Sequence, residues 1–291
     1  MPTQHLIKLN DGAEVPWIAF GTGTAHYNQN ASEVVRMAID NGFTHLDGAQ
    51  VYENEETLGE GIKASGKPRS ELFITTKLNK LAPGETVKQS LQASLQKLGV
   101  DYVDLFLIHF FVPWAKEGRI KEVWKGMEEV KKEGLAKSIG VSNFRIEDIK
   151  EVLDGASIVP AVNQLEFHPY IWKTIEPLVK LHNEHGIVTA SYGGQTPVAR
   201  VPEGPLTPVL ETIRARLEEA RGKPVTAGQV LTKWLAQKGA IVVTTSSKAE
   251  RVKEYLDSAN VPDLTEEEIG AIETTGAKLH KRIFLRQHFG E

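Results

Sequence analysis

The sequence predicts an α/β protein, a closed (β/α)8 TIM barrel with an N-terminal β-hairpin and extra helices. Eight short apolar runs alternate with segments of helical periodicity. The connections between these runs are long enough for parallel strands, which need a crossover rather than a tight turn. Several runs also stop on a charged or polar residue, and the carboxyl ends of barrel strands are where chemistry lies. An open doubly wound sheet is the alternative fold.

The hairpin comes first in the chain. Its strands are expected at Leu6–Leu9 and Glu14–Pro16, joined through Asp11-Gly12, a pair that tolerates positive φ angles. The eight barrel strands then follow as short apolar runs. They are expected at Trp17–Gly21, Phe43–Leu46, Leu72–Thr76, Tyr102–Ile108, Lys137–Val141, Ala161–Glu166, Ile187–Ser191 and Ala240–Thr244.

Helical periodicity fills the intervals between these strands. Val87, Leu91, Leu95 and Leu98 recur at helical spacing, and Gly99 ends the run. The expected helices are Ser32–Asn41, Glu55–Ser65, Glu85–Leu98, Ile120–Lys132, Ile146–Leu153, Thr174–His185, Pro208–Arg221 and Thr226–Lys238. The alternative open sheet is disfavoured, because the turn after the first strand, Gly21–Ala25, lacks the third glycine of a dinucleotide fingerprint.

Composition narrows the classes of function. The 291 residues are 41% hydrophobic and 25% charged, with a net charge of −4, and no stretch is typical of an interdomain linker. One domain over residues 1–291 is expected, without a nucleic-acid or membrane surface, as a monomer or weak dimer. The absence of cysteine excludes disulfides and thiolate metal sites. Residues 1–5 do not resemble a leader, so a cytoplasmic location is expected.

Four polar residues follow successive strand-like runs and form a candidate proton-donating site. Asp47, Lys77 and His109 end three of the runs, and Tyr52 lies five residues beyond Asp47. A phenol is a poor acid at neutral pH, so we expect the Lys77 ammonium to lower the pKa of Tyr52. Asp47 would hold Lys77, and His109 would hydrogen-bond a carbonyl oxygen.

Each of these residues also has a structural interpretation. Asp47 could cap a helix, Lys77 could be an amphipathic rim residue, and His109 could be a hydrogen-bonded core histidine. Taken singly, each is more often structural than catalytic. Their joint occurrence at neighbouring strand ends favours catalysis. His182 and His185 share a helix face, but we interpret them as a solvated helix end rather than a metal site.

A second set of residues suggests the recognition of a nucleotide. Ser142, Asn143 and Gln164 bring hydroxyl and amide groups suited to a carboxamide, and Tyr192 could stack on a flat ring. After the eighth strand, Thr244–Arg251 combines hydroxyls with basic residues at a helix start, which suits a phosphate. A serine N-cap with a solvated basic first turn explains that last segment equally well.

Three segments resemble signatures of the aldo-keto reductase family: Leu46–Glu55, Ile139–Phe144 and Val162–Tyr170. The resemblance extends from the hairpin to the last helix. It implies carbonyl reduction with NADPH, Tyr52 as proton donor, Asp47 and Lys77 as its tuning pair, and His109 orienting the substrate. It also implies that Ser142, Asn143 and Gln164 bind the nicotinamide carboxamide while Tyr192 stacks on the ring.

The chain departs from the family pattern around the expected cofactor. Thr245-Ser246 stands where the family usually has Lys-Ser, so Lys248 and Arg251 are expected to bind the 2′-phosphate of NADPH. Gly23 replaces an aromatic residue and should widen the pocket, leaving Phe110, Phe111 and Trp114 as apolar walls. The remaining expected cofactor contacts are Gly21, Thr22, Gly23, Asp47, Gly193, Gln195, Thr245, Ser246, Ser247 and Tyr255.

Two short segments refine the expected substrate. Val243–Lys248 and Ser191–Gly194 resemble a fungal branch that includes ketopantoyl lactone, conjugated polyketone and α-keto amide reductases. The expected substrate is therefore a ketone, an α-dicarbonyl or an aldehyde. An aldose- or xylose-type aldehyde reductase and a non-catalytic NADPH-binding regulatory protein are the alternatives. The C-terminal stretch Leu279–Glu291 is expected to overhang the pocket.

Overall fold

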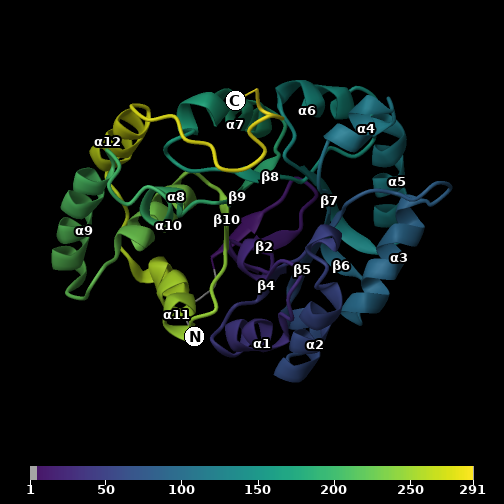
Figure 1. Cartoon of the computed structure of the whole chain (residues 1–291), viewed down its shortest axis with the longest axis horizontal. Coiled ribbons are helices and arrows are strands. Elements are labelled where there is room, and N and C mark those ends of the chain that lie inside the picture. Colours follow the sequence, from purple (N-terminus) through teal and green to yellow (C-terminus); the bar gives the residue numbers. More distant parts are fainter. Residues whose placement is uncertain (1–4, 291) are drawn as a thin grey trace.

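The barrel is closed and all of its strands are parallel (Figure 1). The computed structural model describes residues 5–290, so residues 1–4, part of the stretch on which the expectation of no leader rests, lie outside the described residues. The barrel strands are β3 (Ile18–Gly21), β4 (His45–Asp47), β5 (Phe73–Leu78), β6 (Val103–Ile108), β7 (Ala136–Ser142), β8 (Val162–Glu166), β9 (Val188–Tyr192) and β10 (Ile241–Thr244). β10 pairs with β3 and closes the ring, which confirms the predicted (β/α)8 fold.

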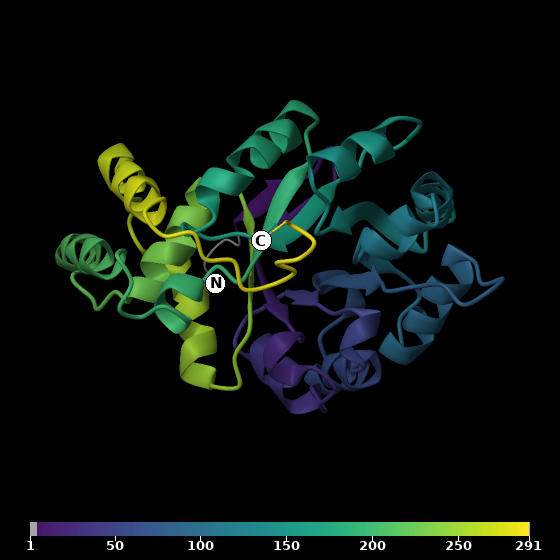
Figure 2. The same cartoon turned by 45° about the horizontal axis from the view of Figure 1, so that its top comes forward.

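Helices surround the barrel (Figures 1 and 2). They are α1 (Ser32–Asp40), α2 (Glu55–Ser65), α3 (Val87–Leu98), α4 (Val112–Lys116), α5 (Ile120–Lys132), α6 (Ile146–Leu153), α7 (Trp172–Glu184), α8 (Thr196–Ala199), α9 (Thr207–Arg221), α10 (Ala227–Gln237), α11 (Ala249–Asp257) and α12 (Glu266–Gly276). The short helices α4 and α8 were not predicted, because one turn of helix carries no apolar period that a sequence pattern can reveal.

Capping residues set several helix boundaries. α3 begins at Val87 rather than at the expected Glu85, because the Thr86 hydroxyl accepts the Gln89 amide N–H and the Gln89 side chain returns to the Thr86 backbone. Gly99, with φ of 66°, ends the helix in the left-handed conformation that glycine adopts without strain. The boundary is thus fixed by local hydrogen bonds.

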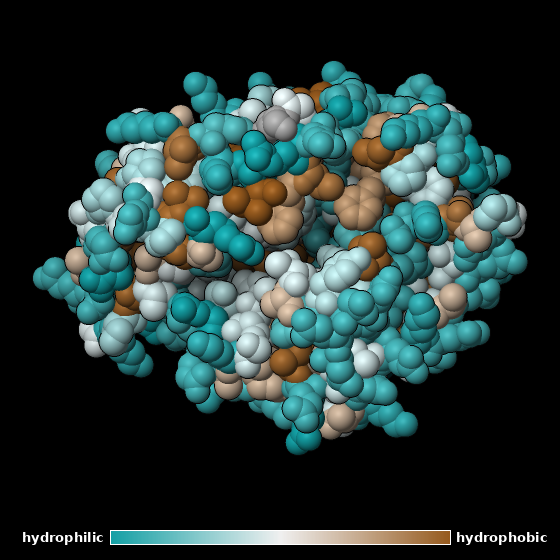
Figure 3. All heavy atoms as spheres, in the orientation of Figure 1, coloured by the Kyte–Doolittle hydropathy of each residue, from teal (hydrophilic) through white to brown (hydrophobic). Residues whose placement is uncertain are grey.

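The N-terminal hairpin closes one end of the barrel. Its strands β1 (Leu6–Lys8) and β2 (Glu14–Pro16) are antiparallel, as predicted. Leu9 and Val15 are buried against Phe73, Leu107 and Val162 in an apolar cluster inside the barrel. Apolar side chains therefore fill the amino-terminal end, and polar groups are left to gather at the carboxyl ends of the strands. The face seen in Figure 3 is hollowed near its centre, with polar and apolar residues on the rim.

His182 is a core residue, so its interpretation as part of a solvated helix end was wrong. Its side chain is fully buried, with Nδ1 2.9 Å from the Thr189 hydroxyl and Nε2 3.0 Å from the Asn163 amide. Burial lowers the pKa of His182 to about 3, so the imidazole is neutral. Within residues 5–290, no group of three or more histidine or carboxylate side chains is placed to hold a metal ion.

Candidate active site

The four predicted catalytic residues meet at the carboxyl end of the barrel. Asp47 ends β4, Lys77 lies near the end of β5, and His109 follows β6. Tyr52 lies in a 3₁₀ turn, η2 (Gln50–Tyr52), directly after β4. The Lys77 ammonium is 3.5 Å from the Tyr52 hydroxyl, and the Tyr52 and His109 rings are 5.5 Å apart in an edge-to-face arrangement. Parallel strands bring these side chains together because their carboxyl ends share one rim.

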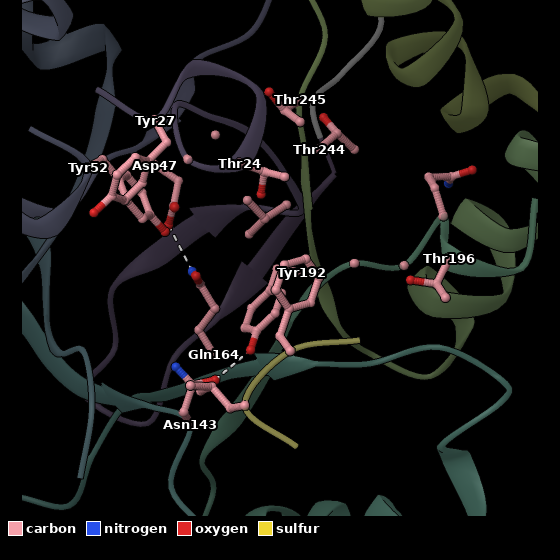
Figure 4. Close-up of a pocket in the computed structure, with 18 of the residues that line it drawn as sticks. Thr24, Tyr27, Asp47, Tyr52, Asn143, Gln164, Tyr192, Thr196, Thr244 and Thr245 are labelled. Atoms are coloured by element: carbon pink, nitrogen blue, oxygen red, sulfur yellow. Dashed lines mark hydrogen bonds between the residues drawn. The ribbon is translucent and has the colours of Figure 1, made fainter. Parts of the chain in front are cut away.

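Lys77 is the centre of this cluster. It is fully buried and donates hydrogen bonds to the Asp47 carboxylate at 2.6 Å and to the Gly48 carbonyl at 2.8 Å. The second Asp47 oxygen accepts a hydrogen bond from the Gln164 amide at 2.8 Å (Figure 4). A buried ammonium without a partner is strongly destabilising, so Asp47 is needed to keep a charged Lys77 in this position.

The direction of the Tyr52 pKa shift differs from the prediction. Burial, and then the Asp47 carboxylate, hold the pKa of Tyr52 well above its usual value. Burial also lowers the pKa of Lys77, a shift that Asp47 opposes, and the ammonium is already paired. The predicted lowering was therefore wrong, because desolvation of the phenolate outweighs attraction to a paired ammonium. Burial and then Lys77 hold the pKa of His109 well below its usual value. Near neutral pH the site thus presents a protonated phenol and a neutral imidazole.

Gly23 controls how close Tyr52 can approach. A Cβ atom added to Gly23 would lie 2.8 Å from Tyr52 Cζ and 3.1 Å from its hydroxyl oxygen. Gly23 also lines the cavity beside Tyr52. The missing side chain makes room for the candidate proton donor, and a wider pocket at Gly23 remains a prediction.

A cavity of about 830 Å³ opens from this cluster across the carboxyl ends of the strands (Figure 4). It runs between the loops that follow β3, β4, β6, β7, β9 and β10. Most of the predicted cofactor residues line it: Gly21, Gly23, Asp47, Asn143, Gln164, Tyr192, Gly193, Gln195, Thr245 and Tyr255. Tyr52, His109 and Phe110 line the same space, as expected of substrate contacts.

Phe111 and Trp114 were predicted as pocket walls, and this was wrong. Both are buried in the hydrophobic core, and the Phe111 ring packs edge-to-face on Phe144 at 5.3 Å. The chain turns into α4 directly after Phe111, with Pro113 in its first turn. This short helix rotates Phe111 and Trp114 into the core and leaves Phe110, stacked on the His109 ring at 4.1 Å, in the cavity wall.

Two predicted polar contacts, Thr22 and Ser142, do not reach the cavity. The Thr22 hydroxyl is buried 3.3 Å from the Asn54 amide oxygen and 3.4 Å from the Asp47 carbonyl. The Ser142 hydroxyl donates to the Gln164 carbonyl at 2.8 Å and is likewise buried. Both side chains tie neighbouring strands together, so their hydrogen bonds are structural.

Asn143 joins three parts of the site. Its backbone adopts φ of 63°, unusual for a residue other than glycine. Its amide nitrogen donates to the His109 carbonyl and to the Ser142 hydroxyl, both at 3.0 Å. Its amide oxygen accepts the Tyr192 hydroxyl at 2.7 Å (Figure 4). Asn143 therefore fixes the orientation of the Tyr192 ring, one wall of the cavity, relative to His109.

The predicted phosphate cradle lies partly outside the cavity. Thr245 lines it, with a buried hydroxyl that has no hydrogen-bond partner among the described residues. Arg251 is paired with Glu254 at 2.6 Å, and Lys248 is exposed at the N-cap of α11. Of the predicted cofactor contacts in this segment, four do not line the cavity: Ser246, Ser247, Lys248 and Arg251.

Several cavity residues were missed at the level of sequence. Arg200, the C-cap of α8, is the one lysine or arginine among the described residues that line the cavity. No spacing singles it out, because its position depends on the unpredicted α8. Phe284 and Leu285 confirm that the C-terminal stretch overhangs the pocket. The other missed lining residues are Thr24, Tyr27, Val51, Gly194, Thr196, Ala199 and Val243, whereas Thr244 belongs to the predicted phosphate segment and also lines the cavity.

The residues present suit a nicotinamide dinucleotide. Tyr192 and Tyr255 offer ring surfaces on separate parts of the wall, and Arg200 supplies a positive charge. Two buried polar atoms, Thr245 Oγ1 and His109 Nδ1, have no hydrogen-bond partner within residues 5–290. Apolar ring surfaces with a few convergent polar groups are typical of a cofactor site.

Comparison with known proteins decides the class. The Aldo/keto reductase family matches residues 17–276. The chain belongs to this family. Its barrel, its enzyme class as an oxidoreductase and NADP(H) as the cofactor are thereby confirmed as predicted. Within this aldo/keto reductase, no helix in residues 5–290 is long and apolar enough to cross a membrane.

Relatives of this aldo/keto reductase include named fungal enzymes. An NAD/NADP-dependent indole-3-acetaldehyde reductase of Schizosaccharomyces pombe is 39% identical over 94% of this chain and 96% of its own. An NADPH-dependent alpha-keto amide reductase of Saccharomyces cerevisiae is 33% identical over 99% and 96%. The crystal structure of a Bombyx mori aldo-keto reductase in complex with NADP superimposes with a TM-score of 0.82, at 34% identity over 99% and 97%.

Proposed function

We propose that this protein reduces a ketone, an α-dicarbonyl or an aldehyde to an alcohol with NADPH, and that Tyr52 is the proton donor. The observation that carries the proposal is the cluster of Tyr52, His109, Asp47 and Lys77 at one end of the cavity. When bound, the nicotinamide cofactor supplies the hydride. The protein must then bind the carbonyl oxygen and give it a proton.

Tyr52 is suited to the proton transfer. The raised pKa of Tyr52 keeps its phenol protonated at neutral pH, so nearly every molecule has a proton to donate. The oxygen of a reduced carbonyl becomes an alkoxide, a stronger base than phenolate, so the proton moves to it favourably. The phenolate that remains is stabilised by the Lys77 ammonium 3.5 Å away. Lys77 therefore acts when the charge develops rather than before it.

His109 is suited to orienting the substrate. Its imidazole is neutral, and its Nδ1 is buried without a partner in the described part of the chain. Nε2 is therefore the ring nitrogen left to contact a carbonyl oxygen, and the imidazole ring lies 5.5 Å from the Tyr52 ring. A neutral imidazole that carries its hydrogen on Nε2 can donate to that oxygen without competing for the proton of Tyr52.

The preference for NADPH is part of the proposal. Lys248 is exposed at the start of α11, three residues after the cavity-lining Thr245 and seven residues before the cavity-lining Tyr255. We assign Lys248 to the 2′-phosphate at the adenosine end, because Arg251 is already paired with Glu254. Arg200, within the wall, would contact the pyrophosphate of either cofactor. The aldehyde part of the substrate range is supported by the indole-3-acetaldehyde reductase, and the α-dicarbonyl part by the alpha-keto amide reductase.

Replacement of Tyr52 by phenylalanine tests the central role. We expect Tyr52→Phe to bind NADPH normally but to lose about 10²- to 10⁴-fold in kcat, the usual value of positioned general acid catalysis. Tyr27→Phe is the matched control, because Tyr27 lines the same cavity with its ring 6.4 Å from Tyr52. NADPH oxidation with a panel of diketones, aldehydes and xylose measures both variants. Wild-type turnover by Tyr52→Phe would exclude the assigned role.

A further inference from the structure

The C-terminal segment crosses the open side of the cavity as a strap, defined here as residues 283–289. Figures 1 and 2 show this yellow segment returning over the barrel beside β8 and β9. Phe284 and Leu285 line the cavity, and the Phe284 ring packs edge-to-face on Tyr192 at 5.4 Å. The strap therefore forms the part of the cavity wall that does not belong to the strand ends and their loops.

Glu166, the last residue of β8, anchors the strap. Its side chain is completely buried, and its two oxygens accept the backbone N–H groups of Ile283 and Phe284, both at 2.9 Å. His168 Nε2 lies 2.9 Å from the same carboxylate. Hydrogen bonds to an ionised carboxylate are stronger than those between neutral groups. The end of β8 is thus hydrogen-bonded to two consecutive peptide groups of the strap. Glu166 itself does not line the cavity.

A second anchor holds the far end of the strap. His288 Nε2 lies 3.0 Å from the carbonyl oxygen of Asn143, and the Arg282 guanidinium lies 4.0 Å over the Phe289 ring. Between the anchors, Leu285 adopts φ of 51°. Such a backbone conformation is strained for a bulky residue and persists only when the surroundings enforce it. Loss of an anchor would therefore release the segment that carries Phe284 and Leu285.

We propose that Glu166 is a positioning residue that fixes the strap and thereby sets the size of the carbonyl compound that the cavity admits. It acts through Ile283 and Phe284 and contacts no reacting group. The anchoring role stands on the contacts of Glu166 alone, whereas the effect on substrate size rests on the proposed carbonyl reductase function. The two roles call for separate measurements.

Glu166→Gln is the test variant, and the chain offers a matched control. An amide keeps the shape of the side chain but presents one NH₂ group, which cannot accept a strap N–H. Glu128 in α5 is also a buried carboxylate that accepts two consecutive backbone N–H groups, those of Ser157 and Ile158, at 2.7 and 2.9 Å. Both of these N–H groups bond to Glu128 Oε1, and Oε2 accepts the Ser157 hydroxyl. Glu128→Gln therefore makes the same carboxylate-to-amide change at a buried position that does not line the cavity.

Trypsin cleavage measures the anchor without any substrate. Arg286 is an exposed trypsin site within the strap, and cleavage there follows the fraction of molecules in which the strap is open. We expect Glu166→Gln to raise the rate of cleavage after Arg286 about 10- to 100-fold, the effect of losing one hydrogen bond to a charged group. Trypsin should cleave the Glu128→Gln variant after Arg286 at the wild-type rate. Equal protection of the strap in all three proteins overturns the proposal.

Substrate selectivity measures the consequence. The ratio to compare is kcat/KM for a phenyl-substituted diketone divided by kcat/KM for glyoxal. We expect Glu166→Gln to raise this ratio by at least about tenfold, because the strap loses the same hydrogen bond and no longer excludes the larger compound. Glu128→Gln should leave the ratio unchanged. A released strap with an unchanged ratio refutes the role in selectivity. If the wild-type protein reduces no carbonyl, the proposed function fails, and the trypsin result alone decides whether Glu166 positions the strap.

His288→Ala provides a second variant in case Glu166→Gln does not fold. It removes the His288 side-chain contact of the second anchor, at a half-buried position. We expect faster cleavage after Arg286 and the same direction of change in the selectivity ratio. Strap cleavage and a ratio that both match the wild type would contradict the proposal.

Discussion

Replacement of Gly23 by alanine tests whether the position of Tyr52 governs catalysis. Gly23 has φ of −76° and ψ of −165°, an extended conformation that any residue adopts, so alanine introduces no backbone strain. The added Cβ would nevertheless lie 2.8 Å from Tyr52 Cζ and 3.1 Å from the hydroxyl oxygen. The substitution therefore acts through one contact, that with the Tyr52 ring.

The size of the effect follows from this contact. Carbon atoms pack at about 3.5–4.0 Å, so the Tyr52 ring must withdraw by roughly 1 Å. A displacement of about 1 Å in a reacting group costs about 10²-fold in rate. This corresponds to about 2.7 kcal/mol in the activation free energy. We expect Gly23→Ala to lower kcat by about that factor.

The assay combines turnover with cofactor binding. NADPH oxidation gives kcat, and quenching of tryptophan fluorescence gives the Kd for NADPH, which should change little. Gly270→Ala in α12 is the control, because nothing lies within 4 Å of its added Cβ. It should gain about 1 kcal/mol of stability and keep the wild-type kcat.

A double mutant separates this explanation from a general disturbance of the site. If Gly23→Ala acts only through the phenol, it should cause no further loss in a Tyr52→Phe background, because the two changes share one target. A wild-type kcat for Gly23→Ala, or a full additional loss in the Tyr52→Phe background, would refute the reasoning.

Two further predictions concern the cofactor and stability against acid. Arg200→Gln should weaken the binding of NADPH and of NADH by a similar factor of about 10 or more, whereas Lys248→Ala should weaken the binding of NADPH alone. Fluorescence titration with each cofactor measures the two dissociation constants. Equal effects of Lys248→Ala on both would contradict the 2′-phosphate assignment. Burial lowers the pKa of His45 to about 4 and that of His182 to about 3, from an ordinary value of 6.5. Both are neutral in the folded protein and take up protons on unfolding, so their stabilisation is complete above pH 6.5 and is lost as the pH falls towards 4 and 3. Urea unfolding should show the free energy of unfolding falling by about 1.4 kcal/mol per pH unit per histidine below pH 6.5. A free energy of unfolding that is constant between pH 6.5 and 5 would rule this out.

Residue type and periodicity were enough to predict the barrel and the four grouped polar residues. Apolar runs alternating with helical periods are local patterns, and Asp47, Lys77 and His109 each lie at or near the end of such a run. Once the strands are parallel, their carboxyl ends must share one rim, so the convergence of these side chains follows from the topology. The family signatures lie in the same segments, which is why the class could also be inferred early.

The details of the site depended on contacts between distant segments. Phe111 and Trp114 turn into the core because α4, too short to carry a period, follows His109. Arg200 reaches the cavity through the equally short α8. Neither short helix can be recognised from the sequence, so Phe111 and Trp114 were assigned incorrectly to the cavity wall and Arg200 was missed.

The sequence by itself determined which chemical groups this protein brings to the mouth of its barrel. The tertiary structure decided the state of those groups, because burial raises the pKa of Tyr52 where residue types alone suggested a lowering. It also decided that Gly23 makes room for Tyr52 and that Glu166 binds a strap more than a hundred residues away in the chain. Desolvation and packing depend on every neighbour in space, and these neighbours are known only once the chain has folded.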